Sequence, residues 1–297
     1  MNREKIALWI SAARPKTLPG SITPVIVAGA LAYKDGFTHL TVFFAAFLVA
    51  LSAQIASNFA NDYFDYKKGA DTRIRVGPKR AVATGAAAPK EMLAATVIML
   101  VLTVSFGVYI AYECSLWLLL VGALICITAL AYSAGPYPLA YNGWGDLCVI
   151  VFYGVIPVIF TYYAITGGVS LQAVMLSVSI GIITDNILLV NNYRDYKEDS
   201  LSGKNTSVVV CGRDFGAKLF LSNIICAFLI AFAALRQFSL WFIALYILLF
   251  VVVILSWRKL ITSEGRELNI LLGQTGRNVL IFGLLLTAGI LCQSGTP

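Results

Sequence analysis

The stretch SNFANDYFDYKKGADT, residues 57–72, follows the apolar run 42–56 almost without a break. Residues three, four or seven apart on a helix share one face. Five polar residues here have that spacing: Gln54, Asn58, Asn61, Asp62 and Asp65. The stretch therefore predicts an apolar helix that leaves a membrane with a stripe of amide and carboxylate groups at its end, where such groups need a binding partner.

The composition of the whole chain places this helix in a membrane protein. Of the 297 residues, 59% are hydrophobic and only 12% are charged, and the mean hydropathy is +0.82. A window of roughly 19 residues separates about nine apolar segments, near 19–33, 41–60, 92–111, 116–134, 146–166, 171–192, 215–235, 239–257 and 276–293. We therefore predict an all-α, polytopic membrane bundle of about nine transmembrane helices. Because no linker separates its halves, residues 1–297 are expected to form a single membrane-embedded domain.

The basic residues are strongly biased to one side of this bundle. The formal net charge is +7, and with the N-terminus in the cytoplasm all but two of the 22 lysines and arginines fall in cytoplasmic segments, the exceptions being Lys34 and Arg236. Cytoplasmic loops of membrane proteins are enriched in basic residues, so this bias predicts a cytoplasmic N-terminus and an external C-terminus. The same distribution argues against nucleic acid as a partner.

A second polar stripe repeats the first one 130 residues later. Asn61-x-x-x-Asp65 is echoed by Asn191-x-x-x-Asp195, four predicted helices further on, so both copies should point the same way on the same side. We expect polar cytoplasmic loops at about 61–91 and 193–214. The second stripe consists of Asp185, Asn192, Asp195 and Asp199, flanked by Asn191, Arg194 and Glu198.

Stacked carboxylates favour a bound cation. Two charges 4 Å apart repel by roughly 4 kcal/mol at an effective dielectric constant of about 20. For a single aspartate at a helix end, solvation by water and lipid headgroups is as good an explanation as a bound cation. Solvation does not explain two stripes of stacked carboxylates. Ligands that are all oxygen suit Mg²⁺, with Mn²⁺ as the alternative, and the single histidine, His39, lies in a short loop on the other side. For Asp185, a hydrogen bond to a neighbouring helix competes with a functional role.

Basic residues are interleaved with these acids. The positive-inside bias explains any one of them, but the set as a whole resembles a clamp in which metal ions and basic side chains hold a diphosphate. The phosphate-binding motif G-x-x-x-x-G-K-[ST] is absent from the sequence, which disfavours ATP. A diphosphate site at the mouth of an apolar membrane bundle suggests a lipid diphosphate as substrate.

Several motifs together resemble the UbiA superfamily of membrane-embedded aromatic prenyltransferases. They are ARPKTLP (13–19), SNFANDYFDYKKGADT (57–72), GPKR (77–80), YSAGPYPLAYNGWGD (132–146) and NNYRDYKEDSLSGKNTSVVVCG (191–212). The general pattern N-D-x-x-D-x-x-x-D would place its last aspartate at position 69, which is glycine here, and Asp71 follows. In the position of this displaced aspartate, the sequence resembles the naphthoate branch of the superfamily.

The resemblance implies a Mg²⁺-dependent enzyme of the bacterial cytoplasmic (inner) membrane, with its active site on the cytoplasmic side. The enzyme would transfer a polyprenyl chain from a polyprenyl diphosphate to 1,4-dihydroxy-2-naphthoate, lose CO₂ and diphosphate, and form demethylmenaquinone. The implied metal ligands are Asn61, Asp62, Asp65, Asp71, Asn192, Asp195 and Asp199. The implied diphosphate ligands are Lys68, Arg80, Arg194 and Lys204. Two residues are hypotheses for the aromatic substrate: Tyr132, to steady the allylic cation, and Asp185, to orient or deprotonate a ring hydroxyl.

Two alternatives remain open from the sequence. The acceptor could be another aromatic compound such as 4-hydroxybenzoate. Only two sequence features, Asp71 and the Asn191–Asn192 doublet, favour the naphthoate branch over enzymes for such acceptors. An ion-coupled membrane transporter would also carry intramembrane carboxylates. Such transporters often have inverted repeats with a site at the midplane, whereas the acids here are expected at one surface in parallel copies.

Overall fold

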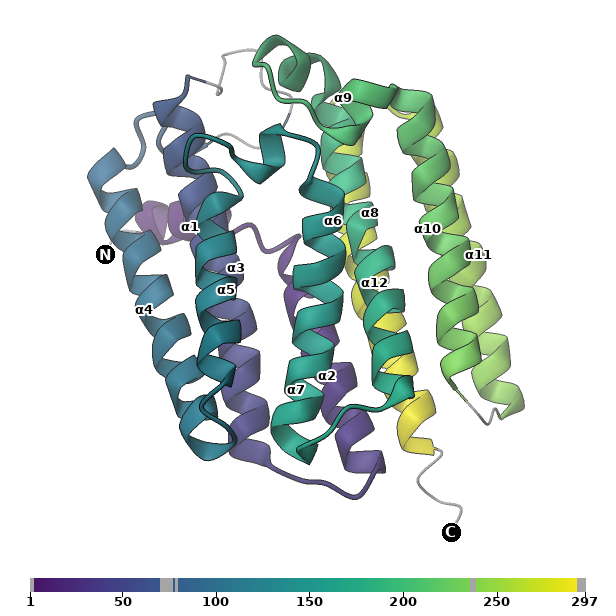
Figure 1. The fold of residues 1–297 in the computed structure, drawn as a ribbon. Coiled ribbons are helices and arrows are strands. Elements are labelled where there is room, and N and C mark those ends of the chain that lie inside the picture. The colour runs from purple at the N-terminus through teal and green to yellow at the C-terminus, as the bar shows by residue number, and fades with distance from the viewer. Residues whose placement is uncertain (1–2, 70–76, 78–79, 236–238, 293–297) are drawn as a thin grey trace.

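The computed structural model describes residues 3–69, 77, 80–235 and 239–292. Asp71, one of the predicted metal ligands, lies outside the described residues. Throughout the described part the regular elements are helices, arranged as a bundle (Figure 1). In chain order they are α1 (Arg3–Ala12), α2 (Leu18–Lys34), α3 (Leu40–Lys67), α4 (Pro89–Glu113), α5 (Leu118–Ala131), η1 (Leu139–Tyr141), α6 (Gly145–Ile150), η2 (Val151–Val155), α7 (Ile156–Thr166), α8 (Leu171–Leu201), α9 (Ser207–Cys211), α10 (Arg213–Ala234), α11 (Leu240–Thr262) and α12 (Glu267–Cys292).

The predicted all-α, multi-pass membrane bundle is confirmed. Among the described residues, seven helical segments are long and apolar enough to cross a membrane: α3, α4, the continuous run α6–η2–α7, α8, α10, α11 and α12. The other two predicted spans form α2, with 17 residues, and α5, with 14. A perpendicular span needs about 20 residues, so the count of nine transmembrane helices stays a prediction.

Helix α8 lies at the centre of the bundle and α4 at its edge. In the most apolar window of α8, 72% of the residues are buried, against 11% in α4. The exposed face of α4 carries Val97, Ile98 and Val101. In water such a face would be unstable, whereas lipid tails solvate it. Helix α8 packs instead against α10, α12 and the α6–η2 segment, and it is therefore a rigid platform for the polar residues at its C-terminal end.

The two polar motifs lie at the same end of the bundle, because α3 and α8 run in the same direction (Figure 1). Both motifs are more helical than the sequence suggested: α3 continues to Lys67 and α8 to Leu201. The predictions of loops starting at residues 61 and 193 were therefore both wrong. The physical reason is that the polar side chains of these last turns find partners inside the bundle, so the helix does not have to end where its apolar residues end.

One close helix crossing shapes the wall of the site. A Cβ atom on Gly154 would lie 2.3 Å from the Cα atom of Gly181, and one on Gly181 would lie 2.5 Å from the carbonyl oxygen of Ile150. Only glycine allows this backbone contact between η2 and α8. The π-helical turn η2 lies at this crossing, and such turns often occur at functional sites. The side chains of Phe152 and Tyr153 in this turn line the cavity described below.

Candidate active site

A cavity of about 260 Å³ opens between the two polar motifs. Its polar end is lined by Asn61, Asp65 and Arg80 from the first motif region and by Asn191, Asp195, Glu198, Asp199 and Lys204 from the second. Much of the rest is apolar, with residues such as Ile110, Val121, Ile125, Phe152 and Phe160. The structure thus brings Asp65 and Asp195 to one cavity, which the parallel repeat had predicted. The arrangement suits a ligand with a highly polar head and a long apolar tail.

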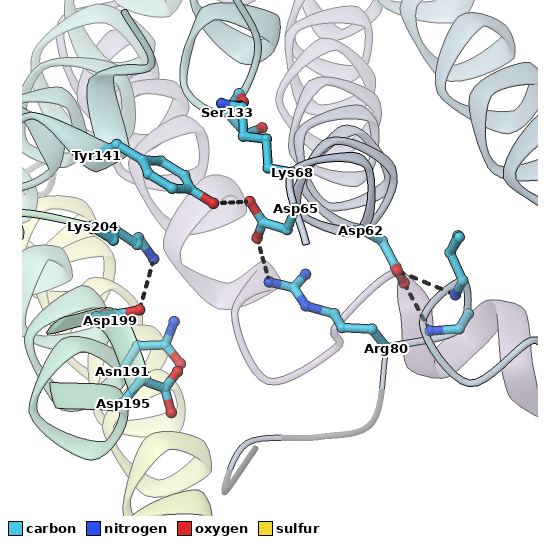
Figure 2. A network of polar contacts seen from close by, with 12 residues as sticks. Asp62, Asp65, Lys68, Arg80, Ser133, Tyr141, Asn191, Asp195, Asp199 and Lys204 are labelled. Atoms are coloured by element: carbon cyan, nitrogen blue, oxygen red, sulfur yellow. Dashed lines mark hydrogen bonds and ion pairs between the residues drawn. The ribbon is translucent and has the colours of Figure 1, made fainter. Parts of the chain in front are cut away.

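Asp65 is the central residue of the first half of the site (Figure 2). Its Oδ2 atom lies 3.0 Å from Nη2 of Arg80, and its Oδ1 atom accepts a hydrogen bond from the Tyr141 hydroxyl at 2.9 Å. Both members of the ion pair are largely buried, with side chains 10% exposed. Charge-assisted hydrogen bonds of this kind are shorter and stronger than neutral ones. Asp65 is therefore held in a defined orientation at the cavity surface.

Asp62, three residues earlier on α3, does not line the cavity. It is 2% exposed, and its carboxylate accepts hydrogen bonds from the backbone N–H groups of Ala81 at 3.0 Å and Val82 at 3.3 Å. Figure 2 shows this carboxylate turned away from Asp65 toward that loop. Its visible function is therefore to anchor the segment that carries Arg80, rather than to face a ligand.

In the second half of the site, Arg194 is committed to Asp195. Its Nε atom donates to Oδ1 of Asp195 at 2.7 Å and its Nη2 atom to Oδ2 at 2.6 Å, a bidentate pair. A further hydrogen bond runs from Nη1 to Oδ1 of Asn269 at 2.8 Å, and the Arg194 side chain is only 1% exposed. Arg194, predicted from the sequence as a diphosphate ligand, thus lies behind Asp195 and fixes the orientation of its carboxylate.

The packing of α8 decides which of the two adjacent asparagines, Asn191 and Asn192, faces the cavity. Asn191 lines the cavity, whereas Asn192 is buried elsewhere and does not. Glu198, which the sequence placed only at the flank of the stripe, also lines the cavity. Lys204 pairs with Asp199, with 3.5 Å between Nζ and Oδ1. The cavity-facing acids of this half are therefore Asp195, Glu198 and Asp199.

Tyr141 is a residue of the site that the sequence reasoning missed. Besides its bond to Asp65, its ring lies under two ammonium groups, 4.6 Å from Nζ of Lys68 and 5.8 Å from Nζ of Lys204. Its backbone carbonyl accepts from the N–H of Asn205 at 3.0 Å, so the segment joins both halves of the site. The only signal for it in the sequence was its place in the motif at 132–146.

Lys68 lies at the rim, where its Nζ atom donates to the carbonyl oxygen of Ser133 at 2.8 Å. Burial lowers the pKa of the Lys68 ammonium group, and the nearby Asp65 carboxylate acts in the opposite direction. Lys68 therefore lies beside the acids of the site but, unlike Arg80 and Lys204, it does not line the cavity itself.

The two residues predicted for the aromatic substrate separate in space. Tyr132 lines the cavity, but Asp185 does not. Asp185 is 1% exposed and accepts a hydrogen bond from Nδ2 of Asn223 on α10 at 3.0 Å. This is the interhelical contact that competed with a functional role for it. A contact between Asp185 and a ring hydroxyl thus has no geometric support here.

The cavity provides oxygen donors rather than a closed metal cage. Within the described residues, no three His, Cys, Asp or Glu side chains lie close enough to hold one ion. Asp65, Asp195 and Asp199 are each paired with a basic side chain instead. Mg²⁺ usually keeps several waters and takes one or two carboxylates together with phosphate oxygens. The donor set therefore fits a Mg²⁺ ion that arrives with a diphosphate.

Comparison with known proteins identifies the family of this chain. The model of the UbiA prenyltransferase family matches residues 21–280. A 1,4-dihydroxy-2-naphthoate octaprenyltransferase from Haemophilus influenzae is 32% identical over 98% of this chain and 98% of its own length. The protein of the same name from Mycobacterium tuberculosis is 37% identical over 69% of this chain and 70% of its own.

The fold agrees with that of solved structures. A UbiA homolog from Archaeoglobus fulgidus bound to DMAPP and Mg²⁺ superposes with a TM-score of 0.66 at 16% identity, over 95% of this chain and 99% of that one. Because the family model matches residues 21–280, which is most of the chain, this chain belongs to the UbiA prenyltransferase family.

Proposed function

We propose that this membrane protein transfers a polyprenyl group from an allylic polyprenyl diphosphate to 1,4-dihydroxy-2-naphthoate, releasing CO₂ and diphosphate, in the biosynthesis of menaquinone. The observation that carries the proposal is that one cavity has both acidic motifs at one end and apolar walls beyond. Relatives that cover most of this chain are named as 1,4-dihydroxy-2-naphthoate octaprenyltransferases, which supports this acceptor.

The polar end of the cavity would bind the diphosphate. Arg80 and Lys204 line the cavity from opposite sides, beside Asp65 and Asp199 respectively. On binding, these two basic side chains would exchange some of their contact with carboxylates for contact with phosphate oxygens. Lys68 at the rim would add positive charge, and Arg194 would act indirectly by holding Asp195.

The same end would hold Mg²⁺, with Mn²⁺ as the alternative. Its ligands would come from Asn61 and Asp65 on α3 and from Asn191, Asp195 and Asp199 on α8, with Asp71 outside the described residues. When bound there, the ion would neutralise the charge that develops on the departing diphosphate. Solved relatives in this fold have been described with DMAPP or GPP and Mg²⁺, which supports this assignment.

In the reaction, the C–O bond between the allylic carbon and the diphosphate breaks, and the diphosphate keeps the electron pair. The ring carbon that bears the carboxylate forms the new C–C bond, and the bond to CO₂ then breaks and returns its electrons to the ring. The total charge is conserved without an added proton, and the product is the hydroquinone form of demethylmenaquinone. The apolar walls with Phe152 and Phe160 would keep water from the cation.

The proposal includes the orientation of the protein in the membrane and its division into domains. We place the end of the bundle with both motifs at the cytoplasmic side of a bacterial cytoplasmic membrane, because nearly all basic residues fall there. We treat residues 1–297 as one domain, since α3 and α8 build the site jointly.

The test is prenyl transfer by the purified protein in lipid nanodiscs, with a radiolabelled polyprenyl diphosphate and either 1,4-dihydroxy-2-naphthoate or 4-hydroxybenzoate. We expect a labelled product and CO₂ with the naphthoate only, no product after chelation with EDTA, and recovery with Mg²⁺. Asp65→Asn and Asp195→Asn should reduce turnover by at least 100-fold. Product with 4-hydroxybenzoate alone would overturn the acceptor assignment, and full turnover in EDTA would overturn the metal.

A further inference from the structure

Arg14 belongs to the motif ARPKTLP, to which the proposed diphosphate chemistry gives no role. It lies in the link between α1 and α2 and has a φ of 54°, the single non-glycine residue with positive φ in the described chain. An arginine rarely adopts this left-handed backbone conformation, which is kept only where the surrounding structure enforces it. Such strained residues cluster at functional sites.

Residues of α3 and the residue before α2 hold the backbone around Arg14. On α3, Nδ2 of Asn58 donates to the carbonyl oxygen of Ala13 at 2.9 Å, immediately before Arg14. The hydroxyl of Thr17 donates to the carbonyl oxygen of Arg14 at 3.0 Å and accepts from Nε2 of Gln54 at 3.3 Å. This network holds both sides of the strained residue.

The network continues across the cavity to η2. The hydroxyl of Tyr153 donates to Oε1 of Gln54, and Tyr153, Gln54, Thr17 and Arg14 all line the cavity. A basic side chain is therefore built into a polar corner of an otherwise apolar wall. Arginine in such a place suits a planar anion, because its guanidinium group can donate two parallel hydrogen bonds to a carboxylate.

The position of this corner separates it from the diphosphate end. Within the described chain, the other basic side chains that line the cavity, Arg80 and Lys204, lie beside Asp65 and Asp199. The backbone beside Arg14 lies at the level of Asn58, which bonds to the carbonyl oxygen of Ala13. Asn58 precedes Asp65 on α3 by seven residues, which is about 10 Å along the helix axis. This distance is suitable for an aromatic ring held between the two ends.

We propose that Arg14 binds the carboxylate of the aromatic acceptor, and that the corner of Arg14, Thr17, Gln54 and Tyr153 is the acceptor subsite. The proposal rests on the proposed function and adds the recognition element for a hydroxylated aromatic acid. With its carboxylate on Arg14, the acceptor has its reacting carbon between the corner and the diphosphate end. The neighbouring aromatic residue Tyr132 lines the same cavity and can pack against the ring.

The test compares the steady-state constants of Arg14→Gln and Arg14→Lys with those of the wild type. Arg258→Gln is the matched control, because Arg258 is exposed on α11 and lies away from the cavity. Arg14→Gln should raise KM for 1,4-dihydroxy-2-naphthoate by at least 10-fold and leave KM for the polyprenyl diphosphate within twofold. The KM of Arg14→Lys for 1,4-dihydroxy-2-naphthoate should lie between those of Arg14→Gln and the wild type, and the control should have the KM of the wild type.

A second arm uses 1,4-naphthalenediol, which lacks the carboxylate. The wild type should use it at least 10-fold less efficiently than the naphthoate, and Arg14→Gln should lose this preference. If the wild type uses both acceptors equally well, the proposal is wrong even if Arg14→Gln does not fold. A rise in KM for the polyprenyl diphosphate alone would place Arg14 in the diphosphate site and would also overturn it.

Direct binding keeps this test separate from the proposed function. The probe is 1-hydroxy-2-naphthoate, whose binding is followed by quenching of protein fluorescence without any turnover. If the wild type fails to prenylate 1,4-dihydroxy-2-naphthoate, the proposed function fails, and the probe still reports on Arg14. Weaker binding by Arg14→Gln than by Arg258→Gln supports the subsite, and equal binding overturns it.

Discussion

The structure assigns Arg194 to a position behind Asp195, and this assignment predicts the effect of Arg194→Met on stability. The substitution removes both bonds of the bidentate pair, at 2.6 and 2.7 Å, and the bonds that Arg194 donates to Asn269 at 2.8 Å and to Asn191 at 2.5 Å. Removing one partner of a buried ion pair costs about 3–5 kcal/mol. Because Asp195 also lines the cavity, where water can solvate it, we expect the lower end, about 3 kcal/mol.

The assay is thermal unfolding of the purified protein in detergent. For a chain of 297 residues, an unfolding entropy of about 2.1 cal/mol/K per residue converts about 3 kcal/mol into a fall in Tm of roughly 5 °C. The double substitution Arg194→Met with Asp195→Leu removes both charges and should recover most of the lost stability, because apolar residues can replace a buried pair without a large cost. It should remain inactive, since Asp195 is lost. The exposed Arg258→Met serves as the control and should leave Tm nearly unchanged.

A different outcome would refute this reasoning. If Arg194 contacted the diphosphate directly, Arg194→Met would raise KM for the polyprenyl diphosphate by 10-fold or more with little change in Tm. The assignment would also be refuted if the double substitution were as unstable as Arg194→Met.

Three further predictions concern the first half of the site. Asp62→Asn should weaken the hydrogen bonds to the backbone of Ala81 and Val82 and lower the free energy of unfolding by about 1–2 kcal/mol. Because Arg80 then loses its position, kcat/KM for the polyprenyl diphosphate should fall by roughly 10-fold. Unchanged stability and kinetics would show that Asp62 does not anchor this segment. Tyr141→Phe, which removes the bond to Asp65 but keeps the ring under the ammonium groups, should retain more activity than Tyr141→Leu in the transfer assay, and equal activities would argue against the cation–π contacts. Because burial lowers the pKa of Lys68, its positive charge is lost earlier than that of an ordinary lysine as pH rises. Affinity for the diphosphate should therefore fall on the alkaline side, and Lys68→Arg should move this fall to higher pH; an alkaline fall at the same pH in both proteins would exclude Lys68 as its source.

The membrane bundle and the pairing of the motifs could be predicted from the sequence because each depends on a simple regularity. Apolar segments of about 20 residues indicate membrane helices whatever their neighbours are. An even number of helices between Asn61-x-x-x-Asp65 and Asn191-x-x-x-Asp195 places both copies at one end. The cavity shared by Asp65 and Asp195 agrees with this expectation.

The facing of individual residues could not be predicted in the same way. A stripe of residues three, four and seven apart covers a broad sector of a helix, and neighbours on it can face a cavity, another helix or a loop. Asn191 faces the cavity whereas Asn192 does not, and Asp65 faces it whereas Asp62 binds the loop at Ala81. These choices depend on how α3 and α8 are rotated by the helices packed against them.

By itself, the sequence determined the class of the protein, the places of its main apolar segments, and the convergence of two acidic motifs, because hydrophobicity and periodicity act locally along the chain. The tertiary structure alone decided which charges meet. It paired Arg80 with Asp65, which lies 15 residues earlier in the chain, brought Tyr141 to the same aspartate from a segment 76 residues away, and held Arg14 in a strained conformation beside the cavity. Such contacts join residues far apart in the chain, and their energies depend on distance, burial and orientation, which only the packed bundle defines.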